Sequence, residues 1–169
     1  MQLRAFLTAL ALALPLCAAH AGDWTVRFDG AGPLKIGMRF DTVNKVLGEH
    51  MERMPKALRG SSNCFQVEPA RQPGLLLMFV GDVLKRVDVM EEGIQSERGI
   101  GLGDPVEKIG QLYGEAVASA PQAYDDSEQT LTVKAGGGQY AIRFDTSKGK
   151  VGAIYAGAWK EVQYIEGCL

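Results

Sequence analysis

Hydrophobic positions along the chain follow two different periods, and these periods alternate. Two short stretches carry apolar side chains three and four residues apart, which is the spacing of an amphipathic helix. Their members are Phe40, Val43, Val46 and Leu47 in the first stretch and Val106, Ile109, Leu112 and Tyr113 in the second. Gly48 and Gly114 follow them, as is typical of a left-handed stop after a helix. The pattern predicts one short helix in each half of the chain.

After each predicted helix the pattern changes to that of β-strands. The predicted strands are 63–67, 75–80 and 83–89 in the first half, and 130–133, 140–144, 151–155 and 162–165 in the second. Gly81-Asp82 predicts a tight hairpin, and a longer turn through 145–149 predicts its counterpart. Residues 116–129 are expected to form a loop. A helix followed by antiparallel strands, twice over, predicts an α+β fold with one sheet and helices on one face.

The two halves are also similar in sequence. Residues 36–49 align without a gap with residues 102–115, and apolar residues and glycines coincide in the two copies. In the second copy Asp104 is the expected helix N-cap, ahead of a proline at the first helical position. Self-similarity of this kind marks a structural unit that packs against its neighbour. We therefore predict two tandem α+β repeats, 22–92 and 93–169, which together form one compact domain.

The repeated element begins with Ile-Gly or Leu-Gly and ends with Leu-Gly or Tyr-Gly, at residues 36–48 and 102–114. Placed twice before antiparallel strands, it resembles the fold of the β-lactamase inhibitor proteins. It is also similar to the small outer-membrane lipoproteins of the barrel-assembly machinery. The resemblance implies an exported binding module without catalysis. No segment matches an inhibitor's enzyme-contacting residues, so the resemblance assigns no binding residues.

Residues 1–21 have the three-part layout of a secretory signal peptide. Arg4 supplies the positive charge, an apolar run follows, and Ala19 and Ala21 place small residues at the cleavage site. Cleavage is expected between Ala21 and Gly22, with export to the periplasm or the exterior. The apolar run is about half of the ~20 residues that cross a bilayer, so no membrane span is expected.

Cysteine usage predicts a covalent link. Cys17 lies within the leader, and a lipoprotein interpretation would acylate it. However, bulky Leu16 stands where such sites need a small residue. Cys64 and Cys168 remain, and two thiols in an oxidising compartment usually pair. We predict a Cys64–Cys168 disulfide rather than a catalytic or redox pair, which usually has close spacing.

Composition excludes several classes of chemistry. Lys and Arg number 18 against 20 Asp and Glu. The chain therefore lacks the excess of positive charge that is typical of nucleic-acid-binding proteins. His50 is the one histidine beyond the leader, and no serine or cysteine spacing marks it as a general base, so a solvated or capping role is predicted. Zinc sites need three or four ligands, which this chain scarcely offers. We expect no metal and no cofactor.

Two segments resemble binding motifs without meeting their requirements. Residues 99–104 alternate glycines before a helix, but Asp104 stands where a phosphate-binding loop needs glycine. Asp125, Asp126 and Glu128 offer the oxygen ligands that calcium prefers, yet they lack the glycine-containing spacing of an EF-hand. A solvated acidic loop is the expected structure there.

The sequence therefore favours a non-catalytic module that binds another protein of the cell envelope, with an inhibitor or immunity protein as one form of it. Two alternatives stay open. One is an envelope hydrolase that uses carboxylates, for which Glu91, Glu92 and the run 125–128 are the clustered candidates. The other is a carrier of a lipid or small ligand. The aromatic candidates for an interface, which core packing would equally explain, are Trp24, Trp159, Tyr155 and Tyr164.

Overall fold

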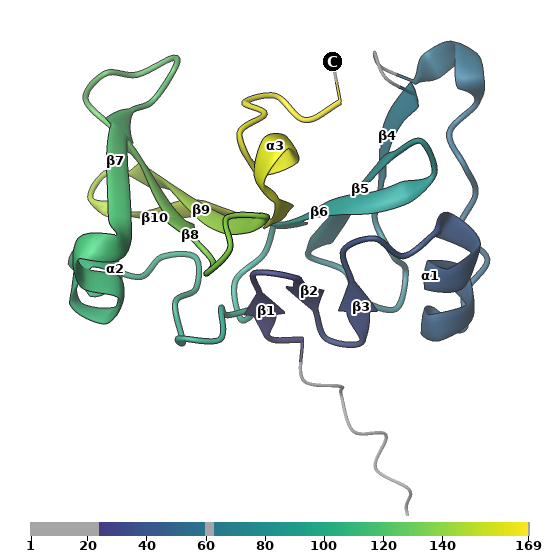
Figure 1. The fold of residues 1–169 in the computed structure, drawn as a ribbon, viewed down its shortest axis with the longest axis horizontal. Helices are drawn as coiled ribbons and strands as arrows, with labels where there is room; N and C mark the ends of the chain where they lie inside the picture. The colour runs from purple at the N-terminus through teal and green to yellow at the C-terminus, as the bar shows by residue number, and fades with distance from the viewer. Residues whose placement is uncertain (1–23, 60–62, 169) are drawn as a thin grey trace, which may run out of the picture.

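A computed structural model describes residues 24–59 and 63–168 (Figure 1). The expected cleavage site at Ala21 and Gly22 lies outside these residues. The elements in chain order are β1 (Val26–Arg27), β2 (Gly30–Ala31), β3 (Leu34–Lys35), α1 (Phe40–Leu47), η1 (Lys56–Leu58), β4 (Cys64–Val67), β5 (Leu75–Val80), β6 (Val83–Val89), α2 (Glu107–Tyr113), η3 (Gly114–Ala116), β7 (Val117–Pro121), β8 (Gln129–Lys134), β9 (Tyr140–Ser147), β10 (Lys150–Ala158) and α3 (Trp159–Val162). Within the described part, no helix has the length and apolarity of a membrane span.

Seven strands form one antiparallel sheet in the order β4-β5-β6-β10-β9-β8-β7. The central pair, β6 with β10, joins a strand of the first half to a strand of the second. The short strands β1, β2 and β3 make a separate sheet. The chain is therefore α+β, as its periodicity predicts, but the expectation of a single sheet is wrong.

The large sheet has two buried faces. On the first, which we call the core face, Phe40 of α1 packs against Phe65 and Phe79 with ring centroids 5.5 and 5.0 Å away. Because neighbouring side chains of a strand point to opposite faces, Gln66 and Met78 point to the second face. There α3 contacts β6, β9 and β10 (Figure 1), so we call it the α3 face. The prediction of helices on one face fits α1 and α2 and is wrong for α3.

The segment before each main helix is bound to the sheet in the same way in both halves. Residues 37–38 exchange two backbone hydrogen bonds with Leu84 at the start of β6, each 2.8 Å long. Residues 103–104 exchange two with Val151 at the start of β10, again each 2.8 Å long. Each helix therefore begins at the edge of a hairpin of its own half.

Both hairpins turn on two residues with positive φ. Gly81 and Asp82 have φ of 59° and 61°, and Lys148 and Gly149 have φ of 53° and 73°. This is the backbone that a type I′ turn requires, and its twist matches that of the flanking strands. The longer turn expected through 145–149 is wrong, because β9 and β10 continue up to a two-residue turn.

Helix α2 begins later than its capping signals predict. The residue before it is Val106, and no side chain caps the helix. The Asp104 carboxylate instead accepts hydrogen bonds from the Gly101 N–H and the Lys108 Nζ, both at 2.8 Å. The bond from Lys108, followed by that from Gly101, holds the pKa of Asp104 below its usual value.

Two further expectations are wrong. Residues 116–129, expected to be a loop, contain β7, whose Val-Ala-Ser-Ala-Pro sequence has one β-branched residue, Val117, and no aromatic residue by which a strand would be recognised. Residues 162–165, expected to be a strand, do not form one. Val162 is the last residue of α3, and the three residues after it continue from that helix.

The central β6–β10 pairing generates a prediction about Gly157. This residue lies opposite Arg86, its φ is +149°, and a Cβ there would fall on the carbonyl oxygen of Lys85. We expect Gly157→Ala to lower the free energy of unfolding by about 2–4 kcal/mol in urea titrations. Gly110→Ala is the matched control, since open space surrounds a Cβ in α2. It should raise stability by about 0.5–1 kcal/mol, and equal effects of the two changes would contradict the assignment.

Candidate functional site

Five polar side chains occupy the centre of the α3 face, where an antiparallel sheet commonly meets water. We call them the arginine cluster. Its members are Arg86 and Asp88 of β6, Arg143 and Asp145 of β9, and Tyr155 of β10. Strand register brings them together, because Tyr155 lies opposite Asp88 on one side and opposite Arg143 on the other.

Arg86 and Asp88 form a buried ion pair, with residue exposures of 1% and 3%. The Arg86 Nε and Nη2 atoms donate to the two Asp88 oxygens at 2.6 and 2.8 Å, and Gln66 Nε2 adds a bond of 3.1 Å. Burial raises the pKa of Asp88, and the Arg86 guanidinium opposes that rise. Such a pair is stabilising only while both partners stay in place.

Arg143 holds the other side of the cluster. Its Nη2 donates to Asp145 at 2.8 Å, and its guanidinium carbon lies 4.2 Å from the centre of the Tyr155 ring. Arg86 approaches the same ring at 4.8 Å, so Tyr155 contacts two cations. Burial raises the pKa of the Tyr155 hydroxyl, which keeps it protonated at neutral pH.

Both arginines bind the carboxyl end of α3. Arg86 Nη1 donates to the carbonyl oxygens of Glu161 and Tyr164, each at 3.0 Å. Arg143 Nη1 donates to those of Val162 and Tyr164, at 2.9 and 3.1 Å. The last carbonyls of a helix have no partner within the helix, and a cation there also suits the helix dipole. The two guanidinium groups therefore fix α3 on the sheet.

We call residues 159–168 the C-terminal strap. At its start the Trp159 N–H donates to the Gln139 carbonyl at 2.9 Å, and the Lys134 Nζ lies 3.4 Å from the centre of the Trp159 ring. Near its end Cys168 forms a disulfide with Cys64 of β4, across a Cα–Cα distance of 5.3 Å. The predicted disulfide is thus present, and it ties the strap to an edge strand of the sheet.

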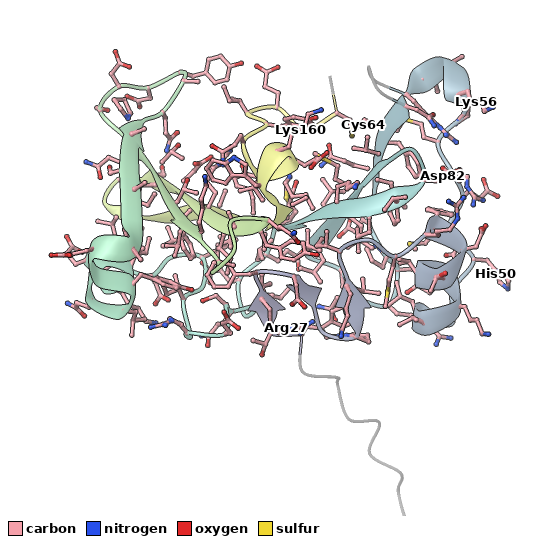
Figure 2. The ribbon with its side chains drawn as sticks, in the orientation of Figure 1. Arg27, His50, Lys56, Cys64, Asp82 and Lys160 are labelled. Carbon is pink, nitrogen blue, oxygen red and sulfur yellow. A yellow bond between two sulfur atoms is a disulfide. The ribbon has the colours of Figure 1, made fainter. Side chains whose placement is uncertain are left out.

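Three projections rise on the α3 side of the sheet (Figure 1). They are η1, the strap and the 122–128 connection between β7 and β8. Each carries an exposed apolar side chain: Leu58 at 70%, Ile165 at 53% and Tyr124 at 76% exposure. Figure 2 shows Lys56 of η1 and Lys160 of α3 on this side, whereas Arg27 of β1 lies on the opposite side. We call Leu58, Tyr124 and Ile165 the apolar rim.

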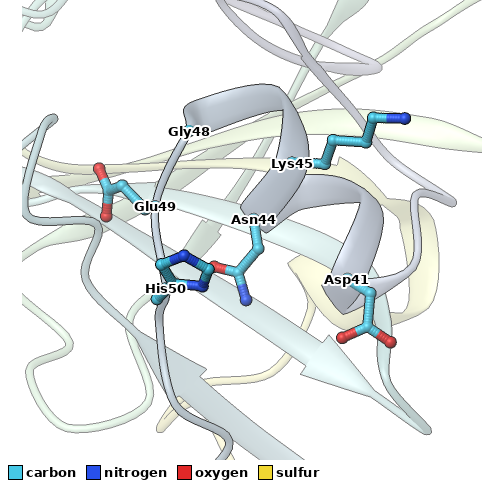
Figure 3. Close-up of a pocket in the computed structure, with 6 residues that line it drawn as sticks. All are labelled: Asp41, Asn44, Lys45, Gly48, Glu49 and His50. Carbon is cyan, nitrogen blue, oxygen red and sulfur yellow. The ribbon is translucent and has the colours of Figure 1, made fainter.

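His50 lies at an open depression beside α1 (Figure 3). The depression is lined by Asp41, Asn44, Lys45, Gly48, Glu49 and His50. Its polar groups mostly serve the fold: Asn44 exchanges bonds of 2.8 and 3.1 Å with the Met51 backbone, and the Glu49 oxygens accept the N–H groups of Ala70 and Arg71. His50 itself is exposed.

The carboxylates proposed for hydrolysis are divided between two segments. Glu91 and Glu92 follow β6 in the connection that runs beside β1, on the side away from the strap (Figure 1). The run 125–128 lies in the β7–β8 connection, on the strap side. There Asp125 accepts the Ser127 hydroxyl and N–H, which lower its pKa, and Glu128 accepts the Thr146 hydroxyl at 2.7 Å. The structure does not bring the two groups together.

Metal binding can be tested on the same residues. Across 24–59 and 63–168, no three side chains of His, Cys, Asp or Glu gather as ligands for an ion. Within the acidic run considered for calcium, Asp125 accepts a hydrogen bond from Ser127 and Glu128 accepts one from Thr146 of β9. The α3 face thus combines the buried polar side chains of the arginine cluster with the exposed side chains of the apolar rim.

Comparisons with known proteins give one structural likeness. No family model and no curated protein sequence matches this chain. A crystal structure of the uncharacterised protein YfeY from Escherichia coli is similar in fold, with 16% identity and a TM-score of 0.48. The alignment covers 79% of this chain and 99% of that one. A likeness at this level carries no argument about activity.

Sequence reasoning did not find the arginine cluster. Arg86 and Asp88 alternate with valines in β6, which is the pattern of a strand with one face in water. Among the aromatic candidates, Trp24 packs against the main hydrophobic cluster. Tyr155 belongs to the arginine cluster, whereas Trp159 and Tyr164 belong to the strap.

The buried pair generates a stability prediction. We expect Arg86→Met to lower the free energy of unfolding by about 3–5 kcal/mol, because Asp88 is left charged and buried without its partner. The double variant Arg86→Met/Asp88→Leu should recover part of this loss, since no buried charge remains. Chemical denaturation of the three proteins measures both effects. A double variant less stable than the single one would contradict the role of the pair.

The disulfide generates a second prediction. Cys64→Ser/Cys168→Ser opens a loop of 104 positions, whose closure is worth at most about 4–5 kcal/mol. We expect the melting temperature to fall by at least about 5 °C. Hydrogen exchange should quicken in residues 159–168 and stay slow in β9 and β10, and reduction of the native protein should reproduce this pattern. Uniform loss of protection would show that the bond does not act through the strap.

Proposed function

We propose that this protein is an exported, non-catalytic module that binds another protein of the cell envelope through its α3 face. The observation that carries the proposal is the apolar rim: Leu58, Tyr124 and Ile165 are exposed on three separate projections of the same side. Apolar side chains that project from one side of a domain can insert into pockets of a partner and act as separate anchors of one interface. The arginine cluster and the disulfide hold the central projection, so the surface is preorganised for a partner.

The size of this surface favours a protein partner. Neighbouring strands lie about 4.8 Å apart, so the outer strands of the seven-stranded sheet are separated by about 29 Å. Leu58 precedes one outer strand, β4, and Tyr124 follows the other, β7. A standard protein interface buries about 800 Å² on each partner, which corresponds to a patch about 30 Å across. A small ligand would touch one projection at a time.

The alternatives receive less support from the same structure. A carrier needs an enclosed apolar cavity, but the core face is packed, with the Phe40, Phe65 and Phe79 rings in mutual contact. A hydrolase of the carboxylate type needs two carboxyl groups about 5–10 Å apart, and the candidates lie in two separate segments. Recognition of a protein requires neither feature.

Export and a tandem origin belong to the same proposal. The leader pattern and the Cys64–Cys168 disulfide support an oxidising compartment, the periplasm or the exterior. Two repeats, 22–92 and 93–169, are supported by the matched hydrogen bonds before α1 and α2 and by the two hairpin turns. In the strand order, the three strands β4-β5-β6 of the first half lie beside the four strands β10-β9-β8-β7 of the second, with β6 next to β10. An architecture similar to the β-lactamase inhibitor proteins is consistent with this arrangement.

The test is a binding experiment with the mature, oxidised protein. The protein is immobilised, exposed to envelope extract, and any saturable partner is purified and titrated by calorimetry. We expect Leu58→Ser/Tyr124→Ser/Ile165→Ser to weaken binding at least about tenfold, since buried apolar anchors carry most interface energy. The control is Val46→Ser/Met90→Ser, which removes two apolar side chains of 41% and 58% exposure outside the rim.

The outcomes separate the functions. Equal weakening by the rim variant and by the control would show that the partner does not use the α3 face. Recovery of no saturable partner would contradict the proposal as a whole. Hydrolysis of an envelope polymer by the purified protein would instead support the carboxylate alternative.

A further inference from the structure

The sheet ends at β7, whose outer side faces no other described strand. The Gln129 N–H donates to Thr146 on β9 at 2.8 Å, so the Pro121–Gln129 pair of the β7–β8 ladder is not hydrogen-bonded. Bonded and non-bonded pairs alternate in an antiparallel ladder. Ser119 and Val117 therefore point their backbone groups away from the sheet, as Pro121 does.

The outer side of β7 offers more acceptors than donors. Ser119 presents both its N–H and its carbonyl oxygen. The N–H of Val117 is already bound by the Gly114 carbonyl, and Pro121 has no N–H. Three carbonyl oxygens, those of residues 117, 119 and 121, thus face outward with one free N–H. An incoming strand would have to supply three N–H groups and one carbonyl.

Charge distinguishes the ends of this strand from its middle. The five residues of β7 are uncharged, and all except Val117 are exposed. Glu115 lies just before them, and Asp125 and Asp126 lie just after them, all three exposed. Hydrogen bonds from Ser127 lower the pKa of Asp125, so this carboxylate is ionised at neutral pH. Both ends of the open edge are therefore acidic.

A second copy of this chain fits the edge poorly. Antiparallel pairing centred on Ser119 would set residue 117 of one copy opposite Pro121 of the other, where the outward carbonyl of residue 117 finds no donor. It would also bring Glu115 of each copy toward Asp125 and Asp126 of the other, and like charges across a strand pair are destabilising. Self-pairing satisfies fewer groups than a foreign strand would.

We propose that β7 accepts an extended segment of another protein as an eighth strand, and that this segment carries basic residues at both ends. Strand addition to an open edge is an established mode of peptide recognition, in which backbone hydrogen bonds supply affinity. The side chains of β7 are short and offer little to distinguish one incoming segment from another. Specificity therefore comes from the two ends of the strand, where Glu115 and Asp126 attract Lys or Arg. The inference rests on the proposed protein-binding function but uses the outer edge of the sheet, which shares only the 122–128 connection with the surface around the apolar rim.

A designed peptide tests this directly on the mature, oxidised protein. The probe is acetyl-Lys-Lys-Val-Thr-Val-Thr-Val-Lys-Lys-amide, and a second peptide carries Glu in place of each Lys. We expect the Lys-ended probe to bind at least about tenfold more tightly at low salt, and to shift the Ser119 amide resonance most. Methylation of its five central amide nitrogens should abolish binding.

Variants of the edge complete the test. Ser119→Pro removes the one outward N–H and should weaken binding at least about tenfold, whereas Ser119→Ala keeps the N–H and should bind like the native protein. Glu115→Lys/Asp126→Lys leaves the strand intact and should reverse the preference to the Glu-ended peptide. Equal binding of the two peptides, no binding at millimolar concentration, or resonance shifts confined to the strap would each overturn the inference. None of these outcomes alters the effect of the rim variant, so the two proposals fail separately.

Discussion

The guanidinium groups of Arg86 and Arg143 bind the last carbonyl oxygens of α3, and the rest of the α3 face depends on this contact. Helix α3 has four residues, which is too short to be stable alone. The arginines give its orphaned carbonyls partners, and Asp88 and Asp145 neutralise the arginines. Most of this charged cluster can be buried because nearly every donor finds an acceptor, which is the condition for burying charge without a large loss of stability.

This contact changes what the sheet can do. An antiparallel sheet with one face in water offers a broad, featureless surface, whereas a fixed helix in its centre divides that surface and raises a projection between two others. The disulfide from Cys168 to Cys64 then ties the strap to β4 at an outer edge of the sheet. A partner that meets such a surface loses little free energy to ordering it, because the central contact is already held in place.

Much of the fold follows from periodicity, while the site does not. The spacing of Phe40 to Leu47 and the hydrophobic runs of β5, β6 and β9 predict elements that the structure contains, because each of these buries a regular face. The strand β7 escaped prediction because most of its residues are small and exposed, and β8 is its one strand partner among the described residues. The arginine cluster escaped because Arg86 and Asp88 have the pattern of a solvated face. Burial of that face depends on a strap 75 residues further along the chain, and no local pattern encodes such a contact.

The two outer strands of the sheet meet the problem of an open edge in different ways. Cys64 and Phe65 of β4 are buried, and the disulfide covers its end. At β7, a proline and the turn of η3 remove N–H groups while the carbonyls remain, so that a second copy would satisfy fewer groups than the foreign strand that we propose. Natural sheets commonly block edges with charge against pairing of any kind. Specificity is a difference between two affinities, and an edge that disfavours one strand and suits another creates such a difference; in the proposed complex, the acidic ends of β7 would increase it.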